Sequence, residues 1–173
     1  MINVKKNFAA FILAIFLLCS TNLVFAASFG NFNATDMKGE IVSQDIFSKA
    51  DLTMINIWGT FCGPCIEEVP ILAQISAEYK DKDVQIVGIV IDAVDGNGTP
   101  QPDQIAAAKK LLTNANADYV NIVPSRDMLN NQLQTIMAVP TTIFVNKQGE
   151  IVGNSVIGSK NKENWLKIID SLH

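Results

Sequence analysis

Runs of apolar residues alternate with amphipathic segments along most of the chain. Two runs, Leu52–Trp58 and Val84–Asp92, are mostly apolar and rich in β-branched residues. Such runs predict strands that are buried on both faces of a sheet. Between them, residues 62–82 place apolar side chains at helical spacing, which predicts a helix packed on that sheet. The apolar stripe of this helix comprises Val69, Leu72, Ile75 and Tyr79.

The alternation continues after the second apolar run. A helix is expected to begin at Asp103 and to reach residue 115, and a short strand follows at residues 119–123. Ser125 is expected to cap a further helix over residues 126–136, because its hydroxyl can accept a backbone N–H of the first turn. Each strand is thus followed by a helix, which is typical of an α/β domain.

Both ends of the domain carry hairpin signals. "DMKGE" at residues 36–40 predicts a turn between two short strands, and Lys147-Gln148-Gly149 predicts a turn between strands at 141–146 and 150–157. Residues 161–172 form an amphipathic pattern that predicts a last helix. Its inward side chains are Trp165, Ile168, Ile169 and Leu172. The whole pattern predicts one domain with a central mixed sheet flanked by helices on both faces.

The first 26 residues have the pattern of a secretory signal peptide. Lys5 and Lys6 precede an uninterrupted apolar run at residues 8–19, and small residues at Val24 and Ala26 would permit cleavage after Ala26. We therefore divide the chain into a signal peptide, 1–26, and a domain, 27–173.

An uncleaved membrane anchor is the alternative for this segment. Residues 8–27 have about the length of ~20 residues that spans a bilayer, but Ser20-Thr21-Asn22 interrupts them. A lipid-modified Cys19 is disfavoured because Leu18 occupies a place where lipoprotein processing needs a small residue. Each alternative places the domain outside the cytoplasm, either at the outer face of the membrane or in the periplasm or medium.

The net charge of the domain disfavours some classes of binding partner. The chain has 13 Lys and Arg against 17 Asp and Glu. Since Lys5 and Lys6 lie in the leader, the remaining domain has a net charge of about −6. No cluster of basic residues follows the leader, so nucleic acid is not expected as a partner, and membrane contact is expected only through residues 8–27.

Two of the three cysteines lie in the domain, at Cys62 and Cys65. A disulfide that closes so short a loop restricts the unfolded chain very little, so the pair is poorly explained as a structural staple. A zinc site lacks further ligands, because His173 is the only histidine and no other cysteine is near. A reactive dithiol is the remaining interpretation, with no metal and no cofactor other than the redox-active disulfide itself.

The dithiol lies where a buried strand gives way to a helix. Free N–H groups and the helix dipole favour a thiolate at the first position, and the thiolate is the nucleophile. Cys62 is therefore expected to attack a substrate disulfide, and the more buried Cys65 to resolve the mixed disulfide. Gly63 permits close approach of a partner, and Pro64 suits the first turn, where its missing N–H is not needed.

These residues, with their flanks, resemble the thioredoxin superfamily, and within it the exported TlpA/ResA-like thiol-disulfide oxidoreductases. The resemblance includes "INIWGTFCGPCIEEVP" and "VPTTIFVNKQGEIV" and covers nearly all of residues 27–173. It implies a thioredoxin-like fold with an N-terminal hairpin extension and a central insert that contains a helix.

The resemblance also implies roles for several residues. Pro140 matches the cis-proline that faces the dithiol, where the backbone of Val139 would pair with an extended substrate, and Pro70 matches the proline within the active-site helix. The residues expected to border the substrate are Trp58, Phe61, Gly63, Pro64, Val139 and Thr141. Phe61 departs from the family, which usually has tryptophan before the first cysteine.

Glu68 matches a glutamate of TlpA/ResA-like proteins that follows the first cysteine by six residues. Thioredoxin itself has a buried aspartate six residues before that cysteine, where this chain has Asn56. The resemblance implies that Glu68 takes the proton of Cys65 as the inner thiol attacks. A solvent-exposed helix glutamate is the other interpretation, and it is the one we expect for Glu67.

The expected function is a monomeric disulfide reductase that acts on exported proteins such as apocytochrome c or oxidised surface proteins. The resemblance implies a membrane thiol-electron transporter as its reductant. A thioredoxin-fold thiol peroxidase is one alternative, although Gly59 stands where that class has threonine. A copper metallochaperone is the other, and it requires a distant histidine that the body of this chain does not contain.

Overall fold

Strand β3 (Leu52–Trp58) is an interior strand of the sheet in the computed structural model, which describes residues 27–173. All seven of its side chains are buried, as expected for a mostly apolar strand covered on both faces. β4 (Val84–Val90) runs parallel to it, with Leu52 opposite Val84 and Trp58 opposite Val90. The predicted signal peptide, residues 1–26, lies outside the described residues.

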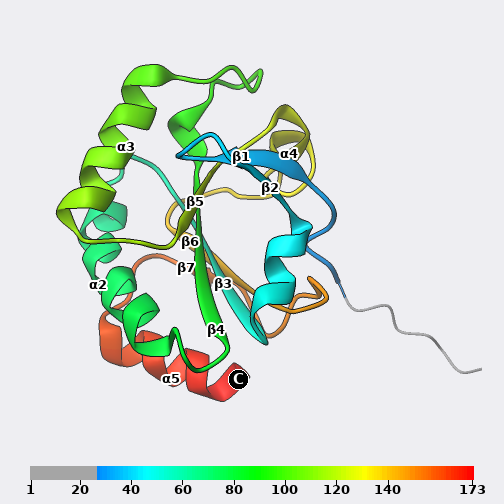
Figure 1. Ribbon diagram of the computed structural model, residues 1–173, viewed down its shortest axis with the longest axis vertical. Helices are drawn as coiled ribbons and strands as arrows, with labels where there is room; N and C mark the ends of the chain where they lie inside the picture. The colour runs from blue at the N-terminus through cyan, green and yellow to red at the C-terminus, as the bar shows by residue number, and fades with distance from the viewer. Residues whose placement is uncertain (1–26) are drawn as a thin grey trace, which may run out of the picture.

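Seven strands form one mixed sheet in the order β2-β1-β5-β4-β3-β6-β7 (Figure 1). β5 (Val120–Val123) is parallel to β4, whereas β6 (Thr141–Asn146) is antiparallel to β3. The outer strands are β1 (Asn33–Asp36), β2 (Ile41–Ser43) and β7 (Val156–Ile157). The sheet and its N-terminal hairpin confirm the predicted fold class.

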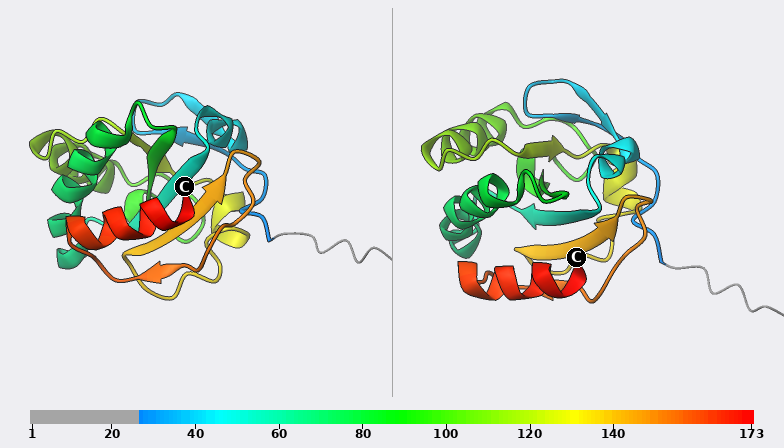
Figure 2. Two further views of the ribbon diagram at one scale, coloured as in Figure 1. Left: turned by 90° about the horizontal axis from the view of Figure 1, so that it is seen from below. Right: turned by 60° about the horizontal axis from the view of Figure 1, so that its bottom comes forward.

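Helices cover both faces of this sheet, but they are divided unequally (Figure 2). The longer helices α2 (Gly63–Tyr79), α3 (Pro102–Asn114) and α5 (Lys162–Leu172) pack on one face. The other face is covered by the 3-10 helix η2 (Gln44–Lys49), by α4 (Arg126–Asn130) and by the segment that precedes β1. Among residues 27–173, none of the helices has the length and apolarity that a membrane crossing needs.

Alternate side chains of β3 divide the core into two layers. Met54 and Trp58 lie on the face of the long helices, while Ile55 and Ile57 lie on the opposite face. Phe29, Phe32 and Phe47 pack edge to face in that second layer. Since the period of a strand is two residues, one-residue slippage of β3 would exchange the two layers.

Several predicted element ends were wrong. β4 stops at Val90, and Ile91–Ala93 form the 3-10 turn η3, so the end of the apolar run is not strand. α3 begins at Pro102, because proline is preorganised for the first helical turn, and Asp103 lies in that turn without capping it. Ser125 does cap α4 by accepting the backbone N–H of Met128.

Two further elements are shorter than expected. α4 ends at Asn130, so residues 131–136 are not helical. β7 contains only Val156–Ile157, because Gly153 has φ +68° and interrupts the extended backbone. The hairpin turn itself is confirmed: Gly149 has φ +77°, which a side chain would strain, and its N–H donates to the Asn146 carbonyl.

Candidate active site

The dithiol lies at the junction of β3 and α2. Cys62 is the N-cap of α2, and its sulfur lies 3.2 Å from the backbone nitrogen of Cys65, which donates to it. The two sulfurs form a disulfide with an S–S length of 2.12 Å. A side chain that caps a helix receives both an N–H group and the positive end of the helix dipole. The fold therefore favours negative charge on the Cys62 sulfur when the disulfide is open.

The exposure of the two cysteines differs less than the sequence suggested. Cys62 is 8% exposed and Cys65 2% exposed, so both are buried in the disulfide form. The carbonyl oxygen of Val139 lies 3.5 Å from the Cys62 sulfur. Cys62 is the slightly more exposed of the two cysteines.

The segment before β6 faces the dithiol. The Val139–Pro140 peptide bond is cis, as the resemblance implies. Pro140 is buried and Val139 is half-buried, and the latter directs its carbonyl toward Cys62. Thr141 follows as the first residue of β6 and pairs with Ile157. Cys62 and Val139, which are 77 residues apart in the chain, thus lie in contact.

The residues predicted to border a substrate fall into two groups. Phe61 is 71% exposed, and Gly63 and Pro64 are also exposed. A side chain at Gly63 would meet no atom within 4 Å, so the space beside the dithiol is open. The side chains of Trp58 and Thr141, however, are buried and cannot touch a bound substrate directly. The prediction that the side chains of Trp58 and Thr141 border the substrate is therefore corrected.

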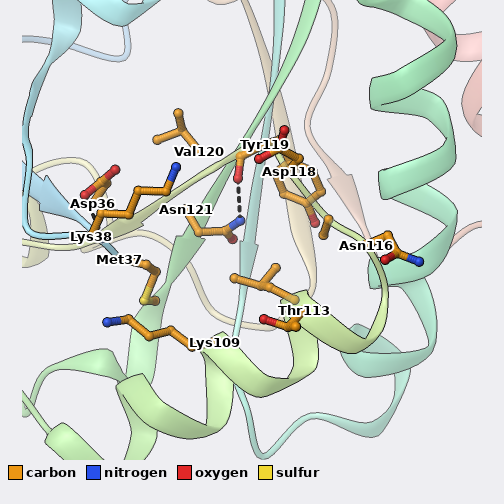
Figure 3. Close-up of a pocket in the computed structure, with 12 residues that line it drawn as sticks. Asp36, Met37, Lys38, Lys109, Thr113, Asn116, Asp118, Tyr119, Val120 and Asn121 are labelled. Carbon is orange, nitrogen blue, oxygen red and sulfur yellow. Dashed lines mark hydrogen bonds between the residues drawn. The ribbon is translucent and has the colours of Figure 1, made fainter.

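Trp58 has a structural role instead. Its indole Nε1 donates to Oδ1 of Asn121 at 3.0 Å, and the Asn121 amide donates to the carbonyl of Tyr119. Asn121 lines a pocket of about 630 Å³ between the β1–β2 turn, α3 and the start of β5. Figure 3 shows the side chains that line it. Neither cysteine lines this pocket, which is separate from the dithiol.

Glu68 lies one helical turn after Cys65 and is only 1% exposed. Its Oε1 accepts the backbone N–H of Lys160 at 2.7 Å and the indole N–H of Trp165 at 3.0 Å. Its Oε2 accepts the side-chain amide of Asn56 at 3.2 Å, and the same amide donates to Thr142. Burial raises the pKa of Glu68 above its ordinary value, and these hydrogen bonds and the charge of Lys160 oppose the rise.

Glu67, in contrast, is exposed, as expected. The two adjacent glutamates therefore have different environments, although the sequence presents them as a pair. The donors of Glu68 could not be found from the sequence, because Lys160 and Trp165 are 92 and 97 residues away. The pattern of α5 indicated only that Trp165 points inward.

A second contact that the sequence did not reveal holds the loop before the dithiol. The carboxylate of Asp92, in the η3 turn that follows β4, accepts the backbone N–H of Thr60 at 3.1 Å and also its hydroxyl. Thr60 lies two residues before Cys62. One signal in the sequence could have indicated this contact. Asp92 closely follows a buried parallel strand, and the carboxyl ends of parallel strands meet at one edge of a sheet.

Comparisons with known proteins agree with this geometry. Residues 26–167 match the model of the Redoxin family. The thiol-disulfide oxidoreductase ResA of Bacillus thuringiensis (strain Al Hakam) is 27% identical over 135 residues, which cover 77% of this chain and 69% of ResA.

Solved structures share the fold at low sequence identity. A thiol:disulfide interchange protein of Chlorobium tepidum TLS superposes with a TM-score of 0.70 at 18% identity, covering 86% of this chain and 97% of the other. A secreted disulfide oxidoreductase of Mycobacterium tuberculosis gives a TM-score of 0.62 at 19% identity, with 82% and 96% covered. The chain therefore belongs to the Redoxin family and is a ResA-like member of the thioredoxin superfamily.

Proposed function

We propose that the protein is an extracytoplasmic disulfide reductase that acts on exported proteins. Its broader class, thiol-disulfide oxidoreductase, rests on the cysteine pair and on the ResA relatives. The observation that carries the proposal is the position of Cys62 as the N-cap of α2, with Cys65 one turn further inside. This position suits an attacking thiolate and a protected second thiol.

The reaction proceeds in two exchanges. The Cys62 thiolate attacks one sulfur of the substrate disulfide, forms a mixed disulfide and releases the other sulfur as a thiolate. The Cys65 thiol then loses its proton and attacks Cys62, which closes the Cys62–Cys65 disulfide and releases the second substrate thiolate. Two electrons pass from the protein to the substrate. We propose that the carboxylate of Glu68 takes the proton of Cys65, because it is buried one turn away on the same helix.

The surface beside Cys62 suits an extended protein segment. The backbone of Val139 is available next to the sulfur, and exposed Phe61 and Pro64 border it. Apocytochrome c before haem attachment and oxidised surface proteins are the substrate types that we propose. The reductant would be a membrane thiol-electron transporter, since the oxidised protein must regain two electrons outside the cytoplasm. We further propose that the protein acts as a monomer.

The location outside the cytoplasm is supported by two observations. The first 26 residues have the pattern of a signal peptide. The M. tuberculosis protein that shares the fold is described as secreted.

The midpoint potential tests the proposed direction. We expect a value near that of thioredoxin, about −270 mV, and far from that of the oxidant DsbA, about −120 mV, because Gly63-Pro64 lies between the cysteines as in reducing thioredoxins. Equilibration in glutathione and dithiothreitol buffers, followed by alkylation of free thiols, measures it. A value near −120 mV would reverse the direction and make the protein an oxidase.

A Glu68→Gln substitution tests the proton acceptor. Since burial raises the pKa of Glu68, its carboxylate forms only as pH rises through a range above that of an exposed glutamate. The release of the second substrate thiolate should accelerate through this range in the wild type. In Glu68→Gln this rise should disappear, and release at the upper end should be slower by about tenfold or more.

Glu67→Gln provides the matched control for that experiment. It removes the same charge from the neighbouring position, where the side chain is exposed. Glu67→Gln should leave the pH dependence of the second thiolate release unchanged. Glu68→Gln should likewise leave the rate of the first attack by Cys62 unchanged. Equal effects of the two substitutions on release would exclude a specific role for Glu68.

A further inference from the structure

The C-terminal part of the chain supplies most of the hydrogen bonds to Glu68. Of its three donors, the backbone N–H of Lys160 and the indole N–H of Trp165 come from the loop before α5 and from α5 itself. Both meet the same oxygen, Oε1. The third donor, Asn56, lies in β3 and meets Oε2.

This arrangement makes the two carboxylate oxygens unequal. A carboxylate oxygen has two acceptor positions, and Oε1 uses both of them for Lys160 and Trp165. Oε2 accepts one hydrogen bond among the described residues, so one of its positions is open. Oε2 is therefore the oxygen with room for a proton, provided that Oε1 is held in place.

Trp165 is itself rigidly held. Its side chain is 0% exposed, and its ring packs edge to face on Phe144 with a centroid distance of 6.3 Å. Phe144 belongs to β6, the strand that begins directly after Pro140. The indole thus connects Glu68 on α2 with β6 and α5.

We propose that Trp165 is a positioning residue for Glu68, whose Oε1 it fixes together with the Lys160 backbone so that Oε2 receives the proton of Cys65. This inference rests on the proposed function. In the step concerned, the Cys62–Cys65 bond forms and the bond between Cys62 and the substrate sulfur breaks. The proton of Cys65 passes to Glu68, and the electron pair of the broken bond leaves with the substrate thiolate.

The other titratable groups around Glu68 leave this assignment intact. The Lys160 ammonium favours the charged carboxylate, but it is held by the carbonyl oxygens of residues 157–159. The Tyr119 hydroxyl is buried and has no hydrogen-bond partner among the described residues, and burial and the Glu68 charge both raise its pKa. Tyr119 therefore stays neutral over the range in which Glu68 titrates. Cys65 lies one helical turn before Glu68 on α2 and is the proton donor itself.

A Trp165→Phe substitution in the full chain tests the proposal, because it keeps an aromatic ring against Phe144 and removes only the N–H donor. The reduced protein is mixed with a chromogenic aromatic disulfide, which releases one coloured thiolate when Cys62 attacks and a second when Cys65 resolves. Loss of a hydrogen bond to a charged group should move the midpoint of the pH dependence of the second release upward by about one unit. Below the midpoint, the second release should slow about tenfold. The first release should not change.

Two comparisons separate positioning from a general structural effect. In a Glu68→Gln background, Trp165→Phe should have no further effect on the second release, because Trp165 is proposed to act only through the Glu68 carboxylate. Trp58→Phe removes the indole N–H of the other buried tryptophan, whose partner is Asn121, and should leave the midpoint unchanged. Lys160→Pro removes the second donor to Oε1 together with the ammonium group; since both favour the carboxylate, the midpoint should shift in the same direction as in Trp165→Phe.

The outcomes are distinct. An unchanged midpoint in Trp165→Phe and Lys160→Pro, with both releases intact, would overturn the positioning role alone. The same conclusion follows if Trp165→Phe slows the second release by the same factor in the wild type and in the Glu68→Gln background. A reduced wild-type protein that releases only one thiolate would overturn the proposed dithiol function as well.

Discussion

A Cys62→Ser variant is expected to fold normally and to lose disulfide reduction completely. Serine preserves the N-cap of α2, because its hydroxyl can accept the N–H of Cys65 as the sulfur does. It cannot act as a leaving group and nucleophile in thiol-disulfide exchange, since only a thiolate does so near neutral pH. We therefore expect insulin reduction at least about 10³-fold below the wild type, with an unchanged thermal midpoint of the reduced protein.

The Cys65→Ser variant should behave differently, although it also lacks turnover. Its Cys62 can still attack, but no inner thiol resolves the product, so a mixed disulfide with the substrate should accumulate. Mass spectrometry of the variant after incubation with a disulfide-containing protein detects this adduct. Equal trapping by the Cys62→Ser variant, through Cys65, would contradict the assignment of the outer sulfur as the attacking one.

Much of the fold could be predicted because its strongest signals are local. β3 and β4 are nearly continuous apolar runs, which only a strand covered on both faces would bury. Ser125 was recognised as a cap from its position alone, since capping involves residues three apart. The position of Cys62 at the start of α2 followed from the same kind of local information, because a buried strand ends just before it.

The surroundings of Glu68 could not be predicted, because they depend on contacts across the domain. The helical period of α5 showed that Trp165 faces inward, but not that its indole reaches a carboxylate on α2. The same limit explains the errors at Trp58, four residues before Cys62, and at Thr141, directly after Pro140, because both side chains are turned into the core. Adjacency to a reactive residue does not indicate exposure when the adjacent residue belongs to a strand covered on both faces.

Element ends were missed where local geometry overrode the apolar pattern. Ile91 continues the apolar run of β4, yet the backbone leaves the sheet there and forms a 3-10 turn. The departure brings Asp92 to the backbone N–H and hydroxyl of Thr60. A turn at this point therefore anchors the loop that carries Cys62, a tertiary effect that hydrophobic periodicity does not record.

A Gly88→Ala substitution is expected to cause one of the largest losses of stability in the domain. A Cβ atom at Gly88 would lie 1.9 Å from Oδ1 of Asn121 and 3.2 Å from Nε1 of Trp58. Gly88 and Asn121 are direct neighbours in the pairing of β4 with β5, so the backbone cannot easily separate them. Asn121 must move, and the hydrogen bond to Trp58 is then lost. We expect the free energy of unfolding to fall by about 2–5 kcal/mol from overpacking and the unpaired indole.

Chemical denaturation of the reduced protein measures this loss, and two further variants identify its cause. Gly96→Ala is the matched control, because a side chain there meets no atom within 4 Å, and it should change stability by less than about 0.5 kcal/mol. Asn121→Ala removes the side-chain amide with which the methyl group added at position 88 collides. The double variant should therefore be more stable than the sum of the two single effects predicts, by about 1 kcal/mol or more. Strict additivity would show that the collision with Asn121 is not the source of the loss, and that β4 tolerates the methyl group by another movement.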